Sequence, residues 1–212
     1  MPVVFRKRIG TGTELGIWKI EERAEQLYQR LQLDERERSV FDSLKNQHKR
    51  SLHWLGSRVL LRTLLNTGRY INLKIDEHRK PYLANFPHHV SISHSHDFAA
   101  VMVSLNGPVG VDIEQISPKI AKVAERFLLP SELDFIDPCQ RLEHLYACWS
   151  AKEAIYKWHG RGGLAFTGGI LLEPFSLGRE GNITASVLLN GRRGNVEVTY
   201  REFEGYMLAW CC

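Results

Sequence analysis

The run Gly110–Glu114 alternates apolar and acidic residues, which constrains it to an extended strand with two unlike faces. Because successive strand side chains point to opposite faces, Asp112 and Glu114 share one face. Val111 and Ile113 share the other. The acidic face either lies in water, as in many half-buried strands, or its two carboxylates hold a hard divalent ion such as Mg²⁺. The strand alone leaves both interpretations open.

The overall composition is that of an ordinary folded protein with a mild positive charge. The 212 residues are 43% hydrophobic and 25% charged, enough for one large domain or two small ones with a real core. A net charge of +4 and a pI near 8.9 fit a polyanionic small molecule or an acidic protein partner. The basic residues are too few and too scattered to indicate nucleic-acid binding.

Cysteine usage and hydropathy favour a cytoplasmic protein without a membrane segment. The four cysteines form no C-x-x-C pair and suggest no disulfide framework. The opening residues are too few and too charged for a signal peptide, and no apolar run reaches the length of a membrane span. We therefore expect a reducing, cytoplasmic setting.

Apolar residues at helical spacing predict one dominant helix in each half of the chain. The two long helices cover 52–65, which Gly68 follows, and 142–158. Shorter helices are predicted over 18–31, from an N-cap at Asp34 to residue 44, over 118–128, and from an N-cap at Ser131.

Apolar and alternating runs predict strands around each long helix. They cover 3–5, 71–75, 90–96, 98–105, 109–114 and much of 170–212. A turn signal at 106–108 predicts a hairpin that pairs 98–105 with the acidic strand.

The offsets of three residues in the first long helix recur in the second: Trp54, Arg58 and Arg62 against Trp149, Glu153 and Lys157. We therefore predict an α+β fold of two similar subdomains, residues 1–114 and 115–212, related by a pseudo-two-fold axis. Each subdomain packs a small, mostly antiparallel sheet on its long helix, and the active site is expected in the cleft between them.

Four histidines fall within nine positions: His88, His89, His94 and His96. Because histidine is the commonest metal ligand, a zinc site is one interpretation. No cysteine or acidic residue completes a tetrahedral set nearby, so we favour phosphate contact by serine and histidine side chains.

Glu153 and Lys157 lie four residues apart on the second long helix, so their side chains are neighbours. An ordinary surface ion pair at this spacing is worth only ~0.2–0.5 kcal/mol. The alternative is that both groups take part in chemistry, and the spacing alone does not decide between the two.

The motifs together resemble those of the phosphopantetheinyl transferases. Gly110–Glu114, followed about forty positions later by Trp149-x-x-Lys152-Glu153-x-x-x-Lys157, resembles the signature pair of that family. Two further motifs, Arg79-Lys80-Pro81 and Ile92-Ser93-His94-Ser95, match the surfactin-synthetase-activating (Sfp-like) branch in order and spacing. The resemblance covers most of the chain, and the size fits a monomeric member with two subdomains.

This resemblance implies a transferase that moves the 4′-phosphopantetheine arm of coenzyme A onto a serine of an apo acyl or peptidyl carrier protein. Adenosine 3′,5′-bisphosphate is the other product. Mg²⁺, with Mn²⁺ as an alternative, is the implied metal, and coenzyme A is the co-substrate. Carriers of fatty-acid and of secondary-metabolite biosynthesis both fall within the resemblance. No nucleic-acid or membrane partner is expected.

The resemblance also implies roles for individual residues. Asp112 and Glu114 are expected as metal ligands, and Glu153 as a third ligand or as the base that activates the serine. Lys157 is expected to neutralise phosphate charge. The residues expected to bind the coenzyme are Lys80, Pro81, Ser93, His94, His53 and Arg58.

Two positions depart from the family pattern. The family often has glycine before Lys-Pro, where this chain has Arg79. An arginine commonly holds coenzyme phosphate early in the first long helix. The matching place here is His53, with Arg50 and Arg58 nearby, and the sequence leaves open which of them serves.

Two rival functions use the same groups. A hydrolase of coenzyme A or another nucleotide would have water as the nucleophile. A non-catalytic module that binds coenzyme A or a carrier protein would not need Asp112, Glu114 and Glu153 together. The intact acidic set favours the enzyme.

Overall fold

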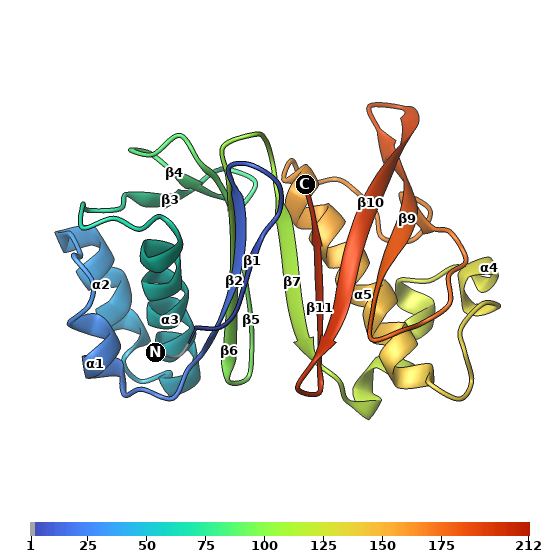
Figure 1. Ribbon diagram of the computed structural model, residues 1–212, viewed down its shortest axis with the longest axis horizontal. Coiled ribbons are helices and arrows are strands. Elements are labelled where there is room, and N and C mark those ends of the chain that lie inside the picture. The colour runs from blue at the N-terminus through green and yellow to red at the C-terminus, as the bar shows by residue number, and fades with distance from the viewer. Residues whose placement is uncertain (1–2) are drawn as a thin grey trace. The chain divides into compact units, whose positions relative to one another are not determined.

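The computed structural model describes residues 3–212, which form two compact units (Figure 1). The first unit ends at Pro108, and the second spans Val109–Cys212. Each unit has its own cluster of buried apolar side chains. No helix within residues 3–212 has both the length and the apolar character to cross a membrane.

The first unit contains a six-stranded antiparallel sheet. Its order is β1-β2-β6-β5-β4-β3. The strands are β1 (Val3–Arg8), β2 (Thr13–Lys19), β3 (Leu73–Ile75), β4 (Pro81–Leu83), β5 (His89–Ser95) and β6 (Phe98–Ser104). Every residue of β6 is buried, as its continuous apolar run predicts for a central strand.

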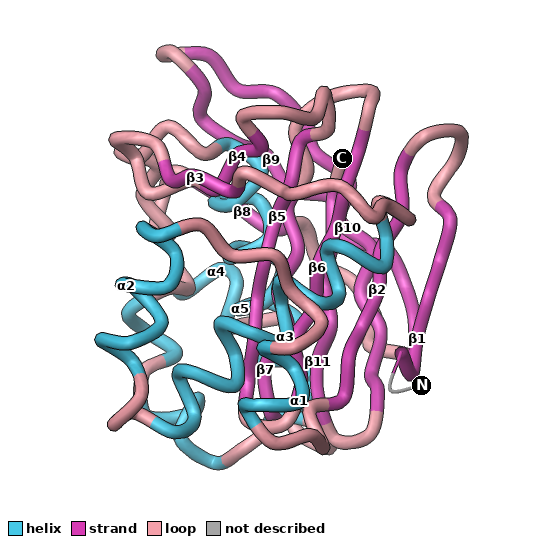
Figure 2. The backbone as a smooth tube through the Cα atoms, turned by 90° about the vertical axis from the view of Figure 1, so that its left-hand side faces the viewer, coloured by secondary structure: helices cyan, strands magenta, loops and turns pink. Residues whose placement is uncertain are grey.

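Three helices belong to this unit: α1 (Ala24–Tyr28), α2 (Glu35–Leu44) and α3 (His48–Leu64). Figure 2 shows α3 alongside the strands of the sheet, and its buried Leu55 and Leu60 join the core of the unit. The predicted cap of α2 is confirmed, because Asp34 Oδ1 accepts a hydrogen bond from the backbone N–H of Glu37 at 2.8 Å.

The predicted helix over 18–31 is wrong at its start. Ile17 and Trp18 lie in β2, which pairs with β1 on one side and β6 on the other, and both side chains are buried. Only Ala24–Tyr28 is helical. The long-range pairing of β2 therefore overrides the helical spacing of the local sequence.

The second unit contains a five-stranded antiparallel sheet of order β7-β11-β10-β9-β8 and one long helix, α5 (Arg141–His159). Its strands are β7 (Gly110–Gln115), β8 (Ile170–Leu172), β9 (Glu180–Leu189), β10 (Arg192–Phe203) and β11 (Tyr206–Cys211). The antiparallel α+β architecture predicted for both units is confirmed, as are both long helices.

Short elements join β7 to α5. They are the 3₁₀ helices η1 (Pro118–Lys122) and η2 (Ala124–Arg126), and the one-turn helix α4 (Pro130–Leu133). The predicted continuous helix over 118–128 is wrong, because Val123 leaves the helical region with φ −123° and ψ 5°. Leu129, not Ser131, precedes the first turn of α4.

The acidic strand pairs differently from the prediction. β7 pairs with β11, from Tyr206 opposite Gln115 to Cys211 opposite Gly110, so the predicted hairpin with 98–105 is wrong. For the same reason the units divide between Pro108 and Val109, six residues before the predicted boundary at 114. The acidic motif therefore belongs to the second unit.

Candidate active site

The acidic strand β7 lies directly against the backbone of α5, and Gly110 makes this approach possible. A Cβ at this position would overlap the carbonyl oxygen of Ala154 and lie 2.7 Å from the backbone nitrogen of Trp158. A glycine is therefore required on steric grounds. Asp112, two positions after Gly110, is thereby held beside the last turns of α5.

Asp112 and Lys157 meet across this contact. The ammonium of Lys157 donates to Asp112 Oδ1 at 2.7 Å. Asp112 is 2% exposed, whereas the Lys157 side chain keeps 25% of its surface in contact with solvent. An ordinary ion pair on the helix surface, the alternative interpretation of Glu153 and Lys157, therefore does not account for this lysine, since it also binds a buried carboxylate on the neighbouring strand.

Glu153 belongs to the same cluster. Burial raises the pKa of its carboxyl group, the negative charge of Asp112 raises it further, and the positive charge of Lys157 lowers it. Two carboxylates and one ammonium thus share a partly desolvated site. A proton or a cation beside Glu153 would relieve the repulsion between the two acids.

The donor chemistry of this cluster fits a hard divalent ion. The charge of Asp112 acts on the carboxyl group of Glu153, and Glu114 lies two residues after Asp112 on the same face of β7. Within residues 3–212, however, no three His, Cys, Asp or Glu side chains are already arranged as a metal-binding group. Asp112 Oδ1 instead accepts the hydrogen bond of Lys157.

Lys152 does not join this cluster, although it adjoins Glu153 in the motif. It is fully buried, and its ammonium points into the interior of the second unit. The sequence does contain a sign of this burial. Cys148, Ala151 and Ile155 occupy the same helical face as Lys152, and all three are fully buried.

In the first unit, His53 of α3 and His94 of β5 are in contact. Their rings stack with centroids 4.3 Å apart and an interplanar angle of 14°. His53 Nε2 lies 2.6 Å from the carbonyl oxygen of His96, so this nitrogen carries a proton and donates. The structure thus brings together two of the residues predicted to bind the coenzyme.

Ser93 does not face the same way as His94. Ser93 is 7% exposed and lies on the opposite face of β5 from His94, which is exposed. The alternation of a strand explains the difference, because adjacent side chains lie on opposite faces.

The loop before β4 presents Lys80 at the end of a tight turn. Asp76 Oδ1 accepts from the backbone N–H groups of His78 at 2.9 Å and Lys80 at 2.8 Å. Arg79 in this turn has a left-handed φ of 66°. That conformation favours glycine, which accounts physically for the glycine that the resembling family often has here.

Arg58 lies on another face of α3 from His53. Five residues correspond to about 500° around a helix, or about 140° apart. Arg58 stacks on Trp54, with its guanidinium carbon 3.5 Å from the ring centroid, and pairs with Glu37 at 3.6 Å. Burial lowers its pKa to about 10. The structure therefore does not bring Arg58 together with His53 and His94.

The comparisons with known proteins agree with this picture. Residues 108–211, almost the whole second unit, match the family model of the 4′-phosphopantetheinyl transferase superfamily. A 4′-phosphopantetheinyl transferase of Bacillus subtilis is 32% identical over 146 residues, which are 66% of this chain and 62% of the relative. Sfp of B. subtilis strain 168 is 28% identical over 146 residues, with the same coverage.

A third relative comes from outside the bacilli. The 4′-phosphopantetheinyl transferase AcpT of Escherichia coli K12 is 35% identical over 120 residues, 54% of this chain and 60% of the relative. The alignments thus span about 60% of the length of each of these relatives. The acidic strand and the helix that carries Glu153 and Lys157 both lie inside the matched residues, so the second unit is similar to the 4′-phosphopantetheinyl transferase superfamily.

Proposed function

We propose that this protein transfers the 4′-phosphopantetheine arm of coenzyme A to a serine hydroxyl of an apo carrier protein. The observation that carries the proposal is the cluster of Asp112, Glu153 and Lys157, in which a partly exposed ammonium binds buried Asp112 and both charges act on Glu153. The match of residues 108–211 to the family model and the named relatives support the same reaction. The product pair is holo carrier protein and adenosine 3′,5′-bisphosphate.

The residues proposed to hold the metal are Asp112, Glu114 and Glu153, with Mg²⁺ as the ion and Mn²⁺ as its substitute. Bound there, the cation would neutralise the charge of the pyrophosphate oxygens. Lys157 is proposed to share this task. Its ammonium is already anchored by Asp112 and retains exposed surface for a phosphate oxygen.

The reaction balances with the groups of this chain. The serine hydroxyl oxygen forms a bond to the phosphorus of the pantetheine phosphate, and its proton leaves. The bond from that phosphorus to the bridging oxygen of the pyrophosphate breaks, and the electron pair departs with adenosine bisphosphate. Lys157 stabilises the charge on the departing phosphate.

Glu153 is proposed to receive the serine proton, directly or through a water molecule. Its raised pKa makes the carboxylate a stronger base than an exposed glutamate. A role as metal ligand uses the same carboxylate. The dependence of turnover on Mg²⁺ in Glu153→Gln separates the two roles, because loss of a ligand raises the Mg²⁺ concentration needed for half-maximal rate.

For the coenzyme we propose contacts from Lys80 and from the stacked pair His53 and His94. The pair offers two imidazole rings on one surface, and an anion is favoured where such rings carry protons. Arg58 is the weaker candidate, because it is committed to Glu37 and Trp54.

One assay tests the proposal against its rivals. The protein is incubated with coenzyme A and Mg²⁺, with and without an apo carrier protein, and adenosine bisphosphate is measured with carrier mass. Release that requires the carrier, with the matching gain in carrier mass, is expected. Release without carrier would mean a hydrolase, and binding without release would mean a non-catalytic module. A cytoplasmic location and a monomeric state stay predictions.

A further inference from the structure

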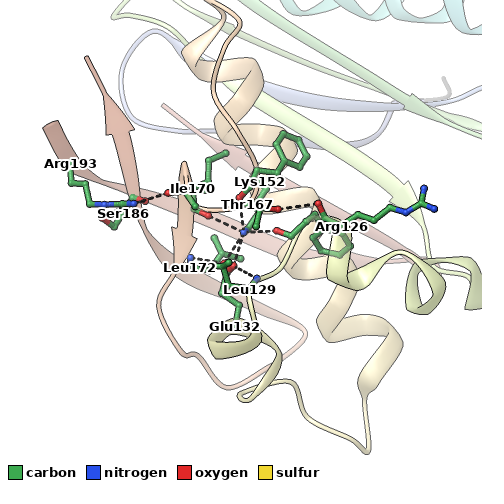
Figure 3. Close-up of polar contacts among 12 residues, drawn as sticks. Arg126, Leu129, Glu132, Lys152, Thr167, Ile170, Leu172, Ser186 and Arg193 are labelled. Carbon is green, nitrogen blue, oxygen red and sulfur yellow. Dashed lines mark hydrogen bonds and ion pairs between the residues drawn. The ribbon is translucent and has the colours of Figure 1, made fainter. Parts of the chain in front are cut away.

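Lys152 is bound from five directions inside the second unit (Figure 3). Its Nζ lies 2.7 Å from Glu132 Oε1 and 2.9 Å from Glu132 Oε2. The same nitrogen donates to the backbone carbonyls of Phe127 at 2.8 Å, Ile170 at 2.9 Å and Phe166 at 3.1 Å. An ammonium has three hydrogens, so these acceptors use its entire donor capacity.

Glu132 is equally committed. It is 2% exposed, and its two oxygens also accept backbone N–H groups, Oε2 from Leu129 at 2.9 Å and Oε1 from Leu172 at 3.0 Å. The pair therefore connects the middle of α5 to the end of η2, the start of α4, the turn after α5 and strand β8. A buried pair with this many hydrogen bonds fixes geometry at several points at once.

The turn 166–170 that binds Lys152 is held along its whole length. Thr167 Oγ1 donates to the carbonyl of Arg126 at 3.1 Å, and Arg193 Nη2 donates to the carbonyl of Gly168 at 2.7 Å. The backbone N–H of Leu188 donates to Gly169 O at 2.8 Å. The ends of this turn are the two carbonyls that Lys152 holds, so the lysine closes the network.

Two of the carbonyls that accept from Lys152 belong to Phe127 and Phe166, whose rings contact side chains of α5. The ring of Phe127 lies 5.0 Å from that of Trp149, and the ring of Phe166 lies 5.5 Å from it. Phe166 also contacts Tyr156, at 5.7 Å. Trp149 and Tyr156 stand four positions before and three positions after Glu153 on the helix. The network thus supports the stretch of α5 that carries Glu153.

From these contacts we infer that Lys152 and Glu132 are a positioning pair for the transfer reaction. They fix the rotation of α5 about its axis and its position along that axis, so that Glu153 and Lys157 meet Asp112. Lys152 itself touches no phosphate. The inference rests on the proposed transferase function. The two lysines of the motif then have different roles: Lys152 positions the helix from inside the unit, and Lys157, five residues later, contacts the phosphate.

Two substitutions test the pair. Lys152→Met removes the charge at nearly constant volume, and Glu132→Gln keeps the shape of the carboxylate. A misplacement of about 1 Å can cost ~10²-fold in rate, so each variant should lower kcat at least ~10-fold. The dissociation constant for coenzyme A, measured without carrier, should change by the same factor in both variants, and by less than kcat does, because both variants displace Lys157 alike. The double variant should be no worse than about the poorer single one.

A phosphate-binding lysine would behave differently. Lys152→Met would then weaken coenzyme A binding at least ~10-fold, while Glu132→Gln would leave binding and kcat unchanged, and that pattern would overturn the inference. Unchanged kcat in folded Lys152→Met and Glu132→Gln would overturn it as well. The proposed function fails if the wild-type protein transfers nothing to any carrier. The inference alone fails if the wild-type protein and the variants all transfer at the same rate.

Matched controls separate position from stability. Glu180→Gln makes the same chemical change in an exposed pair with Arg201 at 3.3 Å and should leave kcat unchanged. Binding stoichiometry for coenzyme A gives the folded fraction of each variant. If both buried variants fail to fold, Thr167→Val loosens the same turn from its exposed side and should lower kcat ~2- to 5-fold at unchanged coenzyme A affinity. Wild-type kcat in Thr167→Val would then contradict the inference.

Discussion

Gly110→Ala should separate the acidic strand from α5. The new Cβ would overlap the carbonyl oxygen of Ala154, and it would lie 2.7 Å from the nitrogen of Trp158, where ordinary contacts begin near 3.4 Å. Both neighbours are backbone atoms of a helix and cannot rotate away. The Ala154 oxygen is the closer of the two, so the two backbones must move apart by roughly 1.5 Å to restore ordinary contact.

The displacement has a stability cost and a catalytic cost. Forcing a methyl group into a packed contact typically costs about 1–3 kcal/mol in the free energy of unfolding. The bond from Lys157 to Asp112, now 2.7 Å, would lengthen beyond hydrogen-bond range. We expect kcat/KM for carrier modification to fall by ~10²-fold, since Lys157 and Asp112 would no longer be held in their present geometry.

Urea denaturation and steady-state kinetics on one preparation measure both effects. Gly194→Ala is the matched control, because it lies in β10 of the same sheet and a Cβ there meets nothing within 4 Å. This control should keep wild-type activity and stability within about 1 kcal/mol. If Gly110→Ala is as stable and as active as Gly194→Ala, the close approach of β7 and α5 does not set the site.

Three further predictions follow from the structure. Arg79→Gly should raise the free energy of unfolding by ~1 kcal/mol, because Arg79 holds a φ of 66° that costs a side-chain-bearing residue strain; urea denaturation measures it. Glu153→Gln should lower kcat ~10²-fold while coenzyme A still binds, whereas Lys157→Ala should also raise KM for coenzyme A; near-normal turnover in both would mean that this helix carries no chemistry. Burial lowers the pKa of His144, whose Nδ1 accepts from Asp137 N–H, so the folded state binds fewer protons than the unfolded state. Stability should therefore be full above the unfolded pKa of about 6.5 and decline as the pH falls below it, and denaturation of His144→Asn at pH 5 to 7.5 should show a flatter profile.

Local patterns predicted the elements whose stability is local. The helical spacing of α3 and α5 and the cap at Asp34 were readable because each depends on residues within a few positions. The pairing of β7 was not, since the turn signal at 106–108 says nothing about which strand lies alongside. Its partner β11 begins more than ninety residues later.

In the candidate site, too, the features set by local sequence were predictable and those set by long-range contacts were not. The alternation in β7 placed Asp112 and Glu114 on one face, and the motif on α5 indicated Glu153 and Lys157. No rule of spacing revealed that Lys157 binds the strand carboxylate, because that contact depends on how closely Gly110 lets α5 approach. The inward direction of Lys152 was detectable only in its apolar helical neighbours, and its partner Glu132 was not detectable at all.

The position of β11 in the sheet affects when the cluster of Asp112, Glu153 and Lys157 can form during synthesis. Residues 206–211 lie between β7 and β10, and all six are buried. Until the ribosome has made these residues, β7, which carries Asp112, has no neighbouring strand in its own sheet and cannot pair. The first unit has a separate core and can fold earlier. Assembly of the acidic cluster is then a late, long-range event, and a nascent chain that stalls before residue 206 would carry a folded first unit without that cluster.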